Sequence, residues 1–265
     1  MSAHLVLALL FVLPAVAPER LADKDIKQLF ERINDDRDRF EDQLDGKLKR
    51  SVLRGPKGEI DVERYLDDLQ ENVGRMKDRF SSEYSASAEV TTVLRQGSDI
   101  QRFMTSQPPN LDGASEWNRL AQTLNELAAA YATTFPMAEG ATARRMNDRE
   151  LQNAAEELAK AADRFKDALD TALKADKAVN PATREAALKE VDALKNAARS
   201  LASRVDDEQP ASGEAQALID QFVALRGSYT GRQLSAAERT EWTSITNQLS
   251  TVVQAFGMQV PAATR

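Results

Sequence analysis

Apolar residues recur every three or four positions over long stretches of this chain, which is the spacing of one buried face of an amphipathic helix. The first stretch spans residues 23–53, and its apolar positions are Ile26, Phe30, Ile33, Phe40, Leu44 and Leu48. The second has a nearly strict heptad spacing at Val62, Leu66, Leu69, Val73, Met76 and Phe80. Stripes of this kind predict helices that pack against their neighbours at shallow angles.

The same stripes return later in the chain at a constant offset of 125 residues. Residues 21–136 align with residues 146–261 without a gap, and 25 of the 116 aligned positions are identical, against about eight expected from this composition. The clearest match pairs residues 38–49 with residues 163–174, and a second pairs Trp117 with Trp242. Two matches near opposite ends with the same spacing indicate an internal duplication.

Each copy has the signals of four helices and no strand signal. Asn180 followed by Pro181 is typical of a helix start, and Ser235 with Glu238 forms a capping-box pattern. Ser87 and Ser212 are expected as N-caps of the third helices. The predicted fold class is all-α: two tandem four-helix bundles over residues 19–137 and 146–265, after an N-terminal signal segment and joined by a linker at residues 138–145.

The N-terminus has the features of a secretory signal segment. Residues 5–17 are apolar apart from Pro14 and end in the small-residue pattern Ala15-Val16-Ala17. This run is too short to span a bilayer as a helix. We therefore expect residues 1–18 to be removed on export, which makes the protein periplasmic or extracellular. The alternative is a buried N-terminal element of a cytosolic protein.

Charge is spread evenly and does not favour nucleic acid as a partner. The formal net charge is -7; residues 1–145 hold 20 basic and 24 acidic residues, and residues 146–265 hold 15 basic and 18 acidic residues. Phosphate binding needs a concentrated basic face, which neither half has.

Catalytic and cofactor chemistry is restricted by the residues that the chain lacks. It contains no Cys, and its one His is His4, inside the expected signal segment. This composition excludes haem attachment, di-iron, zinc and copper sites with His or Cys ligands, and a Ser-His-Asp triad in the mature chain. The acidic runs 35–38 and 206–208 lack the spacing of a calcium loop and are expected to be solvated helix surface. No cofactor, metal or catalytic residue is therefore expected, and the prediction is a protein that is not an enzyme.

One set of charged residues is retained in both copies and is the candidate interaction face. Its members are Asp38, Arg39, Asp42, Asp45 and Lys49 in the first copy, and Asp163, Arg164, Asp167, Asp170 and Lys174 in the second. Arg39 with Asp42 and Asp45 with Lys49 have the spacing of intrahelical ion pairs, so local helix support is the simpler explanation of the set. Trp117 and Trp242 begin the stripe of the fourth helices and are expected in the core rather than in a ligand platform.

Three function classes remain open. The leading hypothesis is an exported, non-enzymatic bundle that acts as an interaction, scaffold or sensing module with another protein as partner. A membrane-surface, lipid-binding bundle is the second, although the polar faces carry both signs of charge and interfacial helices are usually basic. The third is a bundle that binds a small ligand in a cavity between helices.

Overall fold

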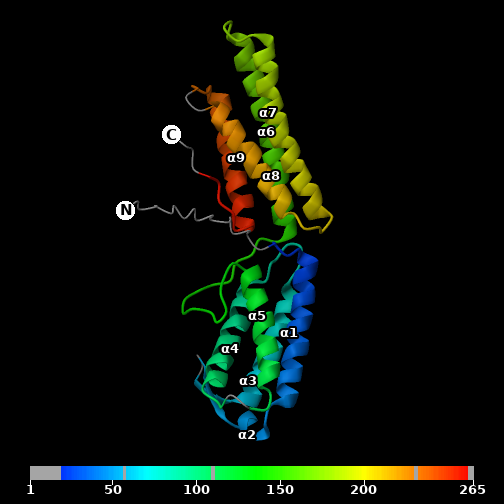
Figure 1. The fold of residues 1–265 in the computed structure, drawn as a ribbon, viewed down its shortest axis with the longest axis vertical. Helices are drawn as coiled ribbons and strands as arrows, with labels where there is room; N and C mark the ends of the chain where they lie inside the picture. Colours follow the sequence, from blue (N-terminus) through cyan, green and yellow to red (C-terminus); the bar gives the residue numbers. More distant parts are fainter. Residues whose placement is uncertain (1–18, 56–57, 109–110, 230–231, 262–265) are drawn as a thin grey trace, which may run out of the picture.

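The protein is all-α and has two separate hydrophobic cores. The computed structural model describes residues 19–55, 58–108, 111–229 and 232–261, and 73% of the chain is helical. One core is built from residues 26–143 and the other from residues 151–256. Figure 1 shows the two helical groups stacked end to end along the long axis of the molecule. We call residues 23–130 the first bundle and residues 148–255 the second bundle.

The first bundle contains five helices and one hairpin among its described residues. In chain order its elements are α1 (Asp23–Gln43), α2 (Gly46–Lys49), β1 (Val52–Gly55), β2 (Gly58–Asp61), α3 (Val62–Arg79), α4 (Ser87–Thr105) and α5 (Ala114–Ala130). The four long helices pack as a ring in which α1 contacts α3 and α5, and α4 contacts α3 and α5. Each consecutive long helix is therefore a neighbour of the last, as short connections require.

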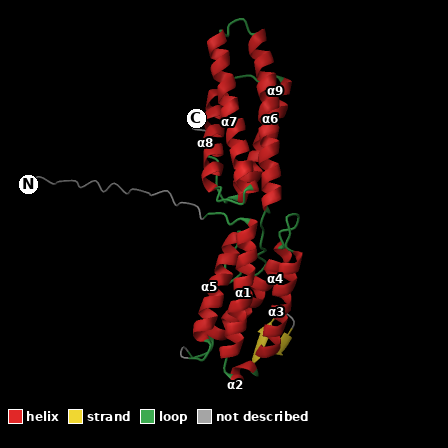
Figure 2. Ribbon diagram, turned by 90° about the vertical axis from the view of Figure 1, so that its right-hand side faces the viewer, coloured by secondary structure: helices red, strands yellow, loops and turns green. Residues whose placement is uncertain are grey.

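The first helix is shorter than the stripe predicted, and the expectation of no strand was wrong. Residues 23–53 were expected as one helix, but α1 ends at Gln43 and Leu44 has an extended backbone. Asp45 then starts α2, because its side chain accepts a hydrogen bond from the Lys47 N–H at 2.7 Å. The antiparallel strands β1 and β2 follow, with Val52 opposite Asp61 and Gly55 opposite Gly58, at the end of the bundle that faces away from the second bundle (Figure 2).

The second bundle consists of four helices, α6 (Asp148–Ala175), α7 (Pro181–Asp206), α8 (Ser212–Tyr229) and α9 (Ala236–Ala255). Here α6 contacts α7 and α9, and α8 contacts the same two helices. The caps expected from the sequence are confirmed: Asn180 accepts from the Thr183 N–H, and Ser235 and Glu238 form the capping box. Ser87 and Ser212, in contrast, are the first residues of α4 and α8 and not their N-caps. The residue before α4, Ala86, has a left-handed backbone with φ 51°.

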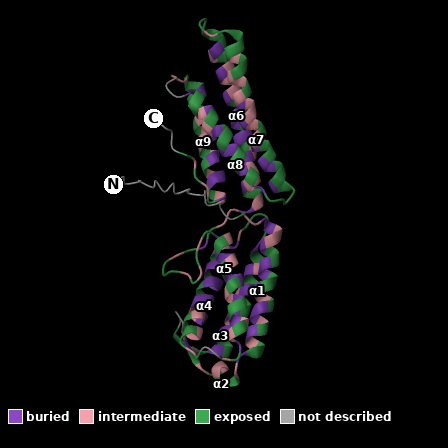
Figure 3. Cartoon of the chain, in the orientation of Figure 1, coloured by how far each residue is buried: buried purple, intermediate pink, exposed green. Residues whose placement is uncertain are grey.

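The apolar stripes face the two cores (Figure 3). Phe30, Phe40 and Phe165 are fully buried. Trp117 is 3% exposed and packs against Phe40, while Trp242 is half-buried and stacks on Phe222 with ring centroids 5.3 Å apart. Both tryptophans thus lie among core aromatics, as the stripe predicted.

Residues 137–145, which we call the strap, lie along α4 in an irregular conformation. The Met137 N–H donates to Ser98 Oγ at 2.8 Å, the Ala143 N–H to Thr91 Oγ1 at 2.9 Å, and the Arg145 N–H to Ser87 Oγ at 3.3 Å. Ala143 belongs to the first core. This segment, expected as a linker, is therefore packed against the first bundle.

Candidate functional site: the junction between the bundles

The two bundles meet where α1 and α6 begin. Asp23 is the first residue of α1, and Asp148, which stands 125 residues later, is the first residue of α6. The first N–H groups of a helix have no partner within that helix and carry a partial positive charge. Two helix N-termini that face each other therefore need an anionic acceptor between them.

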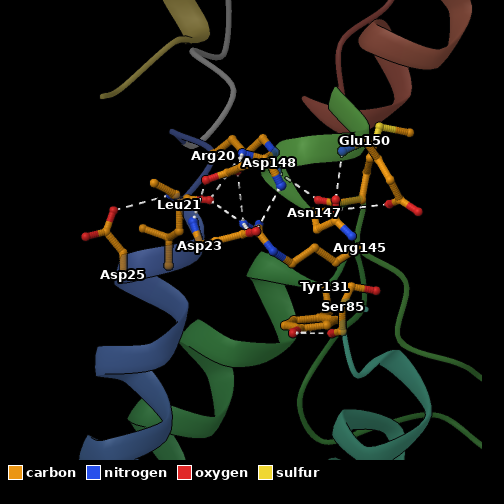
Figure 4. A network of polar contacts seen from close by, with 12 residues as sticks. Arg20, Leu21, Asp23, Asp25, Ser85, Tyr131, Arg145, Asn147, Asp148 and Glu150 are labelled. Atoms are coloured by element: carbon orange, nitrogen blue, oxygen red, sulfur yellow. Dashed lines mark hydrogen bonds and ion pairs between the residues drawn. The ribbon is translucent and has the colours of Figure 1, made fainter. Parts of the chain in front are cut away.

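Each of the two aspartates supplies that acceptor to the other helix. The Asp23 N–H donates to Asp148 Oδ2 at 2.7 Å, and the Asp148 N–H donates to Asp23 Oδ2 at 3.0 Å. The same bond is therefore made twice, once from each bundle to the other. We call this arrangement, together with Arg20 and Arg145, the reciprocal clasp (Figure 4).

Arg20 and Arg145, again 125 residues apart, close the clasp with a second pair of matching bonds. Arg20 donates to Asp148 Oδ1 at 2.5 Å and to the Met146 carbonyl at 2.8 Å. Arg145 donates to Asp23 Oδ1 at 2.7 Å and to the Leu21 carbonyl at 2.7 Å. Leu21 and Met146 also correspond at the offset of 125. The junction therefore has approximate two-fold symmetry, the geometry of an isologous interface between two like subunits.

The clasp is largely removed from water. The side chains of Arg20 and Arg145 are 9% and 2% exposed, and those of Asp148 and Asp23 are 14% and 12% exposed. Burial lowers the pKa of Arg20, as does the neighbouring Arg145 charge, whereas Asp148 opposes this shift. An ion pair of this kind is screened little by salt, and removal of one partner leaves a buried charge without compensation, which costs about 3–5 kcal/mol.

The symmetry is broken where Tyr131 and Phe256 correspond. The Tyr131 hydroxyl donates to the Ser85 carbonyl at 2.7 Å, and burial raises the pKa of this hydroxyl. In the second bundle the Phe256 ring lies 5.9 Å from the Arg20 guanidinium carbon. One copy thus supports the junction with a hydrogen bond and the other with a cation–π contact.

A pocket of about 480 Å³ lies beside the clasp, between the C-terminal ends of α5 and α9. Its wall is formed mainly by small or apolar residues, including Ala130, Met146, Ala255 and Phe256. Three arginines and two glutamates also line it: Arg20, Arg144, Arg145, Glu19 and Glu126. The size is that of a small-ligand pocket, but the mixed charge selects no ligand class.

The first copy of the predicted interaction face is divided by the break after α1. Asp38 pairs with Arg37, and Arg39 pairs with Asp36 at 3.4 Å. The expected Arg39–Asp42 pair is absent from the described residues. The Asp45–Lys49 pair is also absent there, because Asp45 caps α2 instead. Asp42 is exposed on the last turn of α1, and Lys49 ends α2.

The second copy of the face lies entirely on α6. Lys174 pairs with Asp170, as the i,i+4 spacing predicts. Arg164 bonds to Glu241 at 2.8 Å and Asp163 to Lys195 at 2.8 Å, so two members connect α6 to α9 and α7. Asp167 is exposed. In both copies the set lies on the part of the helix that points away from the clasp, and the structure does not bring the two copies together (Figure 1).

The clasp was not predicted, although the sequence contains a signal for it. Arg20 and Asp23 are repeated as Arg145 and Asp148 with the same spacing. Arg20 lies one residue before the aligned region, and charged residues next to a helix start are usually read as helix caps. Only the fold reveals that each pair binds the other copy.

The described residues and the known proteins add no candidate chemistry. Among the residues that the structure describes, no group of three or more Asp, Glu, His or Cys side chains could hold a metal ion. Within those same residues, no helix combines the length and the hydrophobicity needed to cross a bilayer. No protein-family model, curated protein or solved structure matches this chain.

Proposed function

We propose that the protein is an exported, non-enzymatic scaffold made by duplication of one helical bundle, which holds two like binding faces at a fixed separation. The reciprocal clasp is the observation that carries this proposal. Residues that correspond at the 125-residue offset exchange the same bonds across the junction. Fusion of two copies of a bundle that once formed a two-fold dimer would produce this pattern.

The clasp also explains how such a scaffold stays straight. Most connections between domains are exposed and mobile. Here two helix N-termini, two carboxylates and two guanidinium groups bond to one another in a buried site. The retained charged set then lies on the outward halves of α1 and α6, around Asp42 in the first bundle and Asp167 in the second.

The first part of the test concerns export. Removal of the apolar segment on export predicts an N-terminus between Val16 and Leu21 in the exported fraction, as read by mass spectrometry. An intact Met1 in the cytosolic fraction would contradict export.

The second part concerns the binding faces. A photo-crosslinking amino acid is placed at the exposed residues Asp42 and Asp167, with the exposed residues Gln28 and Asn153 as controls nearer the junction. The control pair is again separated by 125 residues, so each bundle has its own control. The proposal expects the outward positions of both bundles to crosslink to the same protein and the control positions to give much less product.

Liposome flotation separates the scaffold from a membrane-surface protein. The scaffold is expected to stay at the bottom of the gradient with neutral and with anionic vesicles. Flotation, or crosslinks from the outward positions to lipid alone, would favour the membrane-surface function instead.

A further inference from the structure

The two arginines of the reciprocal clasp are matched in sequence but are not held equally. Arg145 pairs with Asp23 at 2.7 Å and also lies 3.7 Å from Asp148, so it reaches both aspartates. Among the described residues, Arg20 forms an ion pair with Asp148 alone. Loss of Arg20 therefore leaves each aspartate next to an arginine, whereas loss of Arg145 leaves Asp23 with no ion-pair partner in that part of the chain.

The backbone on both sides of Arg145 is bonded to a bundle. Before it, the strap follows α4, and the Arg144 N–H donates to the Tyr131 carbonyl at 2.9 Å. After it, Asn147 caps α6 by accepting from the Glu150 N–H at 2.8 Å. Arg145 is thus fixed by its neighbours in the chain as well as by its own side chain.

Residues 19–22, which we call the arm, have fewer anchors. The arm runs into α1 at one end. Upstream of Arg20, its one hydrogen bond among the described residues joins the Ser212 N–H to Glu19 Oε1, at 3.2 Å and exposed to water. Arg20 itself adds its bonds within the clasp and its contact with the Phe256 ring. The arm therefore depends mainly on the Arg20 side chain.

We propose that the arm is a releasable latch of the clasp, and that Arg145 with Asp23 and Asp148 is the pivot that keeps the bundles joined when the arm opens. The two helix N-terminal bonds between Asp23 and Asp148 use no side chain of the arm. Release of the arm also opens the pocket beside the clasp, because residues 19–21 form part of its wall. This proposal rests on the clasp as the fastener of the proposed scaffold, but not on export.

The expected N-terminus connects the latch to processing. Removal of the apolar segment is expected to leave an N-terminus between Val16 and Leu21. That range includes chains with and without Arg20. A mature chain that keeps Arg20 has both latch and pivot, whereas one that begins at Leu21 has the pivot alone.

Trypsin cleavage after Arg20 reports the opening of the latch, because the protease binds the Arg20 side chain, which is 9% exposed in the clasp. Residues 1–19 contain no Lys or Arg, so the product of this first tryptic site begins at Leu21. The Arg145–Met146 bond, 125 residues later, is the matched control in the same molecule. Arg144→Gln removes the neighbouring tryptic site. When opening and closing are fast, the rate of cleavage follows the population of the open form.

Brief digestion of the full chain, read by mass spectrometry, is expected to cut after Arg20 at least about ten-fold faster than after Arg145. Opening at Arg145 breaks strap bonds in addition to a charged hydrogen bond, and one further charged bond is worth about that factor. Phe256→Leu removes the ring beside Arg20 and should speed cleavage there roughly three-fold relative to cleavage after Arg145. Tyr131→Phe, the matched change in the first bundle, should leave this ratio unchanged.

The distance between the bundles tests whether the pivot holds without the arm. Spin labels are attached to Lys47→Cys in α2 and Lys177→Cys after α6. A chain that begins at Leu21 should keep the maximum of the distance distribution and broaden around it. Arg145→Gln in the full chain should lose that maximum. Circular dichroism should show retained helix content in both.

The outcomes separate the latch from the clasp. Cleavage after Arg20 that is no faster than cleavage after Arg145 would overturn the latch and leave the clasp in place. An unchanged, narrow distance distribution in the chain that begins at Leu21 would also overturn it, because the arm would then hold nothing. A mature exported chain that begins at Leu21 would overturn the latch for the mature protein. Rapid cleavage after both arginines would overturn the clasp, and with it both the latch and the proposed scaffold.

Discussion

The two bundles close their cores by different means, although they share one apolar pattern. In the first bundle the core side of α1 carries Asp36 and Arg37, both buried, and Thr123 Oγ1 donates to Asp36 at 2.7 Å. The corresponding residues of α6 are Ala161 and Ala162, both fully buried. The first bundle therefore satisfies polar groups inside its helix contacts, whereas the second uses small side chains.

The difference extends to the helix ends and to the groove beside the third helix. The first bundle breaks after α1 and adds α2 and a hairpin, while α6 runs without interruption for 28 residues. Phe135 and the strap cover α4, while Phe222 and Trp242 leave a groove beside α8. Two bundles with the same apolar stripes can thus differ in their helix ends and surface grooves, provided that each core stays closed.

The largest expected effect comes from the matched core aromatics Phe40 and Phe165. Phe165→Ala should cost about 3–5 kcal/mol and melt the second bundle first, because the ring packs on both Tyr229 and Trp242. Phe40→Ala should cost a similar amount in the first bundle, where the ring packs on Trp117. Thermal melts followed by the fluorescence of each tryptophan, with the other replaced by Phe, assign each loss to a bundle. A loss that falls equally on both bundles would contradict separate cores.

Gly97→Ala tests the packing of the Phe135 ring over Gly97 of α4. The added Cβ would lie 2.6 Å from Leu124 Cδ1 and 3.0 Å from Phe135 Cε2, so the substitution should destabilise the first bundle by about 1–3 kcal/mol. Gly213→Ala on α8 is the matched control, because a Cβ added there would meet no atom within 4 Å. The control should stabilise the second bundle by up to about 1 kcal/mol, because Gly in a helix loses more conformational freedom on folding than Ala. Equal effects of the two substitutions in urea melts would show that the Phe135 ring does not constrain α4.

Alkaline pH should destabilise the second bundle through Tyr229. Burial raises the pKa of Tyr229 to about 12, and its hydroxyl is buried without a partner. In the unfolded chain the phenol ionises near pH 10. Its stabilising contribution is therefore complete below pH 10 and is lost as the pH rises toward 12, by about 1–2 kcal/mol.

Tyr229→Phe should remove this alkaline loss and cost little at pH 7. Tyr131→Phe, in contrast, should cost about 1–2 kcal/mol at pH 7, because it leaves the Ser85 carbonyl without its donor. Urea melts at pH 7 and pH 11 make the comparison. An unchanged alkaline slope in the Tyr229→Phe chain would contradict the assignment.

The smallest effect is expected at Arg37. This side chain is 4% exposed, and its Nε is buried without a partner, while its ion-pair partners Asp38 and Glu41 keep contact with water. Arg37→Met should therefore change stability by less than about 1 kcal/mol or increase it slightly. A loss above about 3 kcal/mol would show that the pair stabilises α1 more than its geometry indicates.

The helix caps and the apolar stripes could be predicted from the sequence, because each depends on residues that are close together in the chain. The caps at Asn180 and Ser235 and the apolar stripes depend on residues within one or two turns, and the structure has them in place. The break after α1 was missed because the apolar spacing continues through Leu44 and Leu48, while Asp45 and Gly46 favour a new helix start. The hairpin was missed because each strand has only four residues.

The junction could not be predicted because its partners are 122 to 128 residues apart. Arg20 and Asp148 have no local signature that distinguishes them from ordinary residues beside a helix start. The repeated Arg-x-x-Asp pattern identifies which residues correspond, but only the fold shows that each arginine donates to the aspartate of the other bundle.

The central claim is that the reciprocal clasp fixes the two bundles as one rigid unit, and a distance measurement between their far ends tests it most directly. Spin labels are attached to Lys47→Cys in α2 and Lys177→Cys after α6, in a chain that has no other Cys. Pulsed electron–electron double resonance should give one narrow distribution of the distance between the two spin labels. The added pair Asp23→Ala and Asp148→Ala should broaden it severely while circular dichroism shows that helix content is retained. A broad distribution in the chain with an intact clasp, or a narrow one that survives loss of both aspartates, would contradict the account.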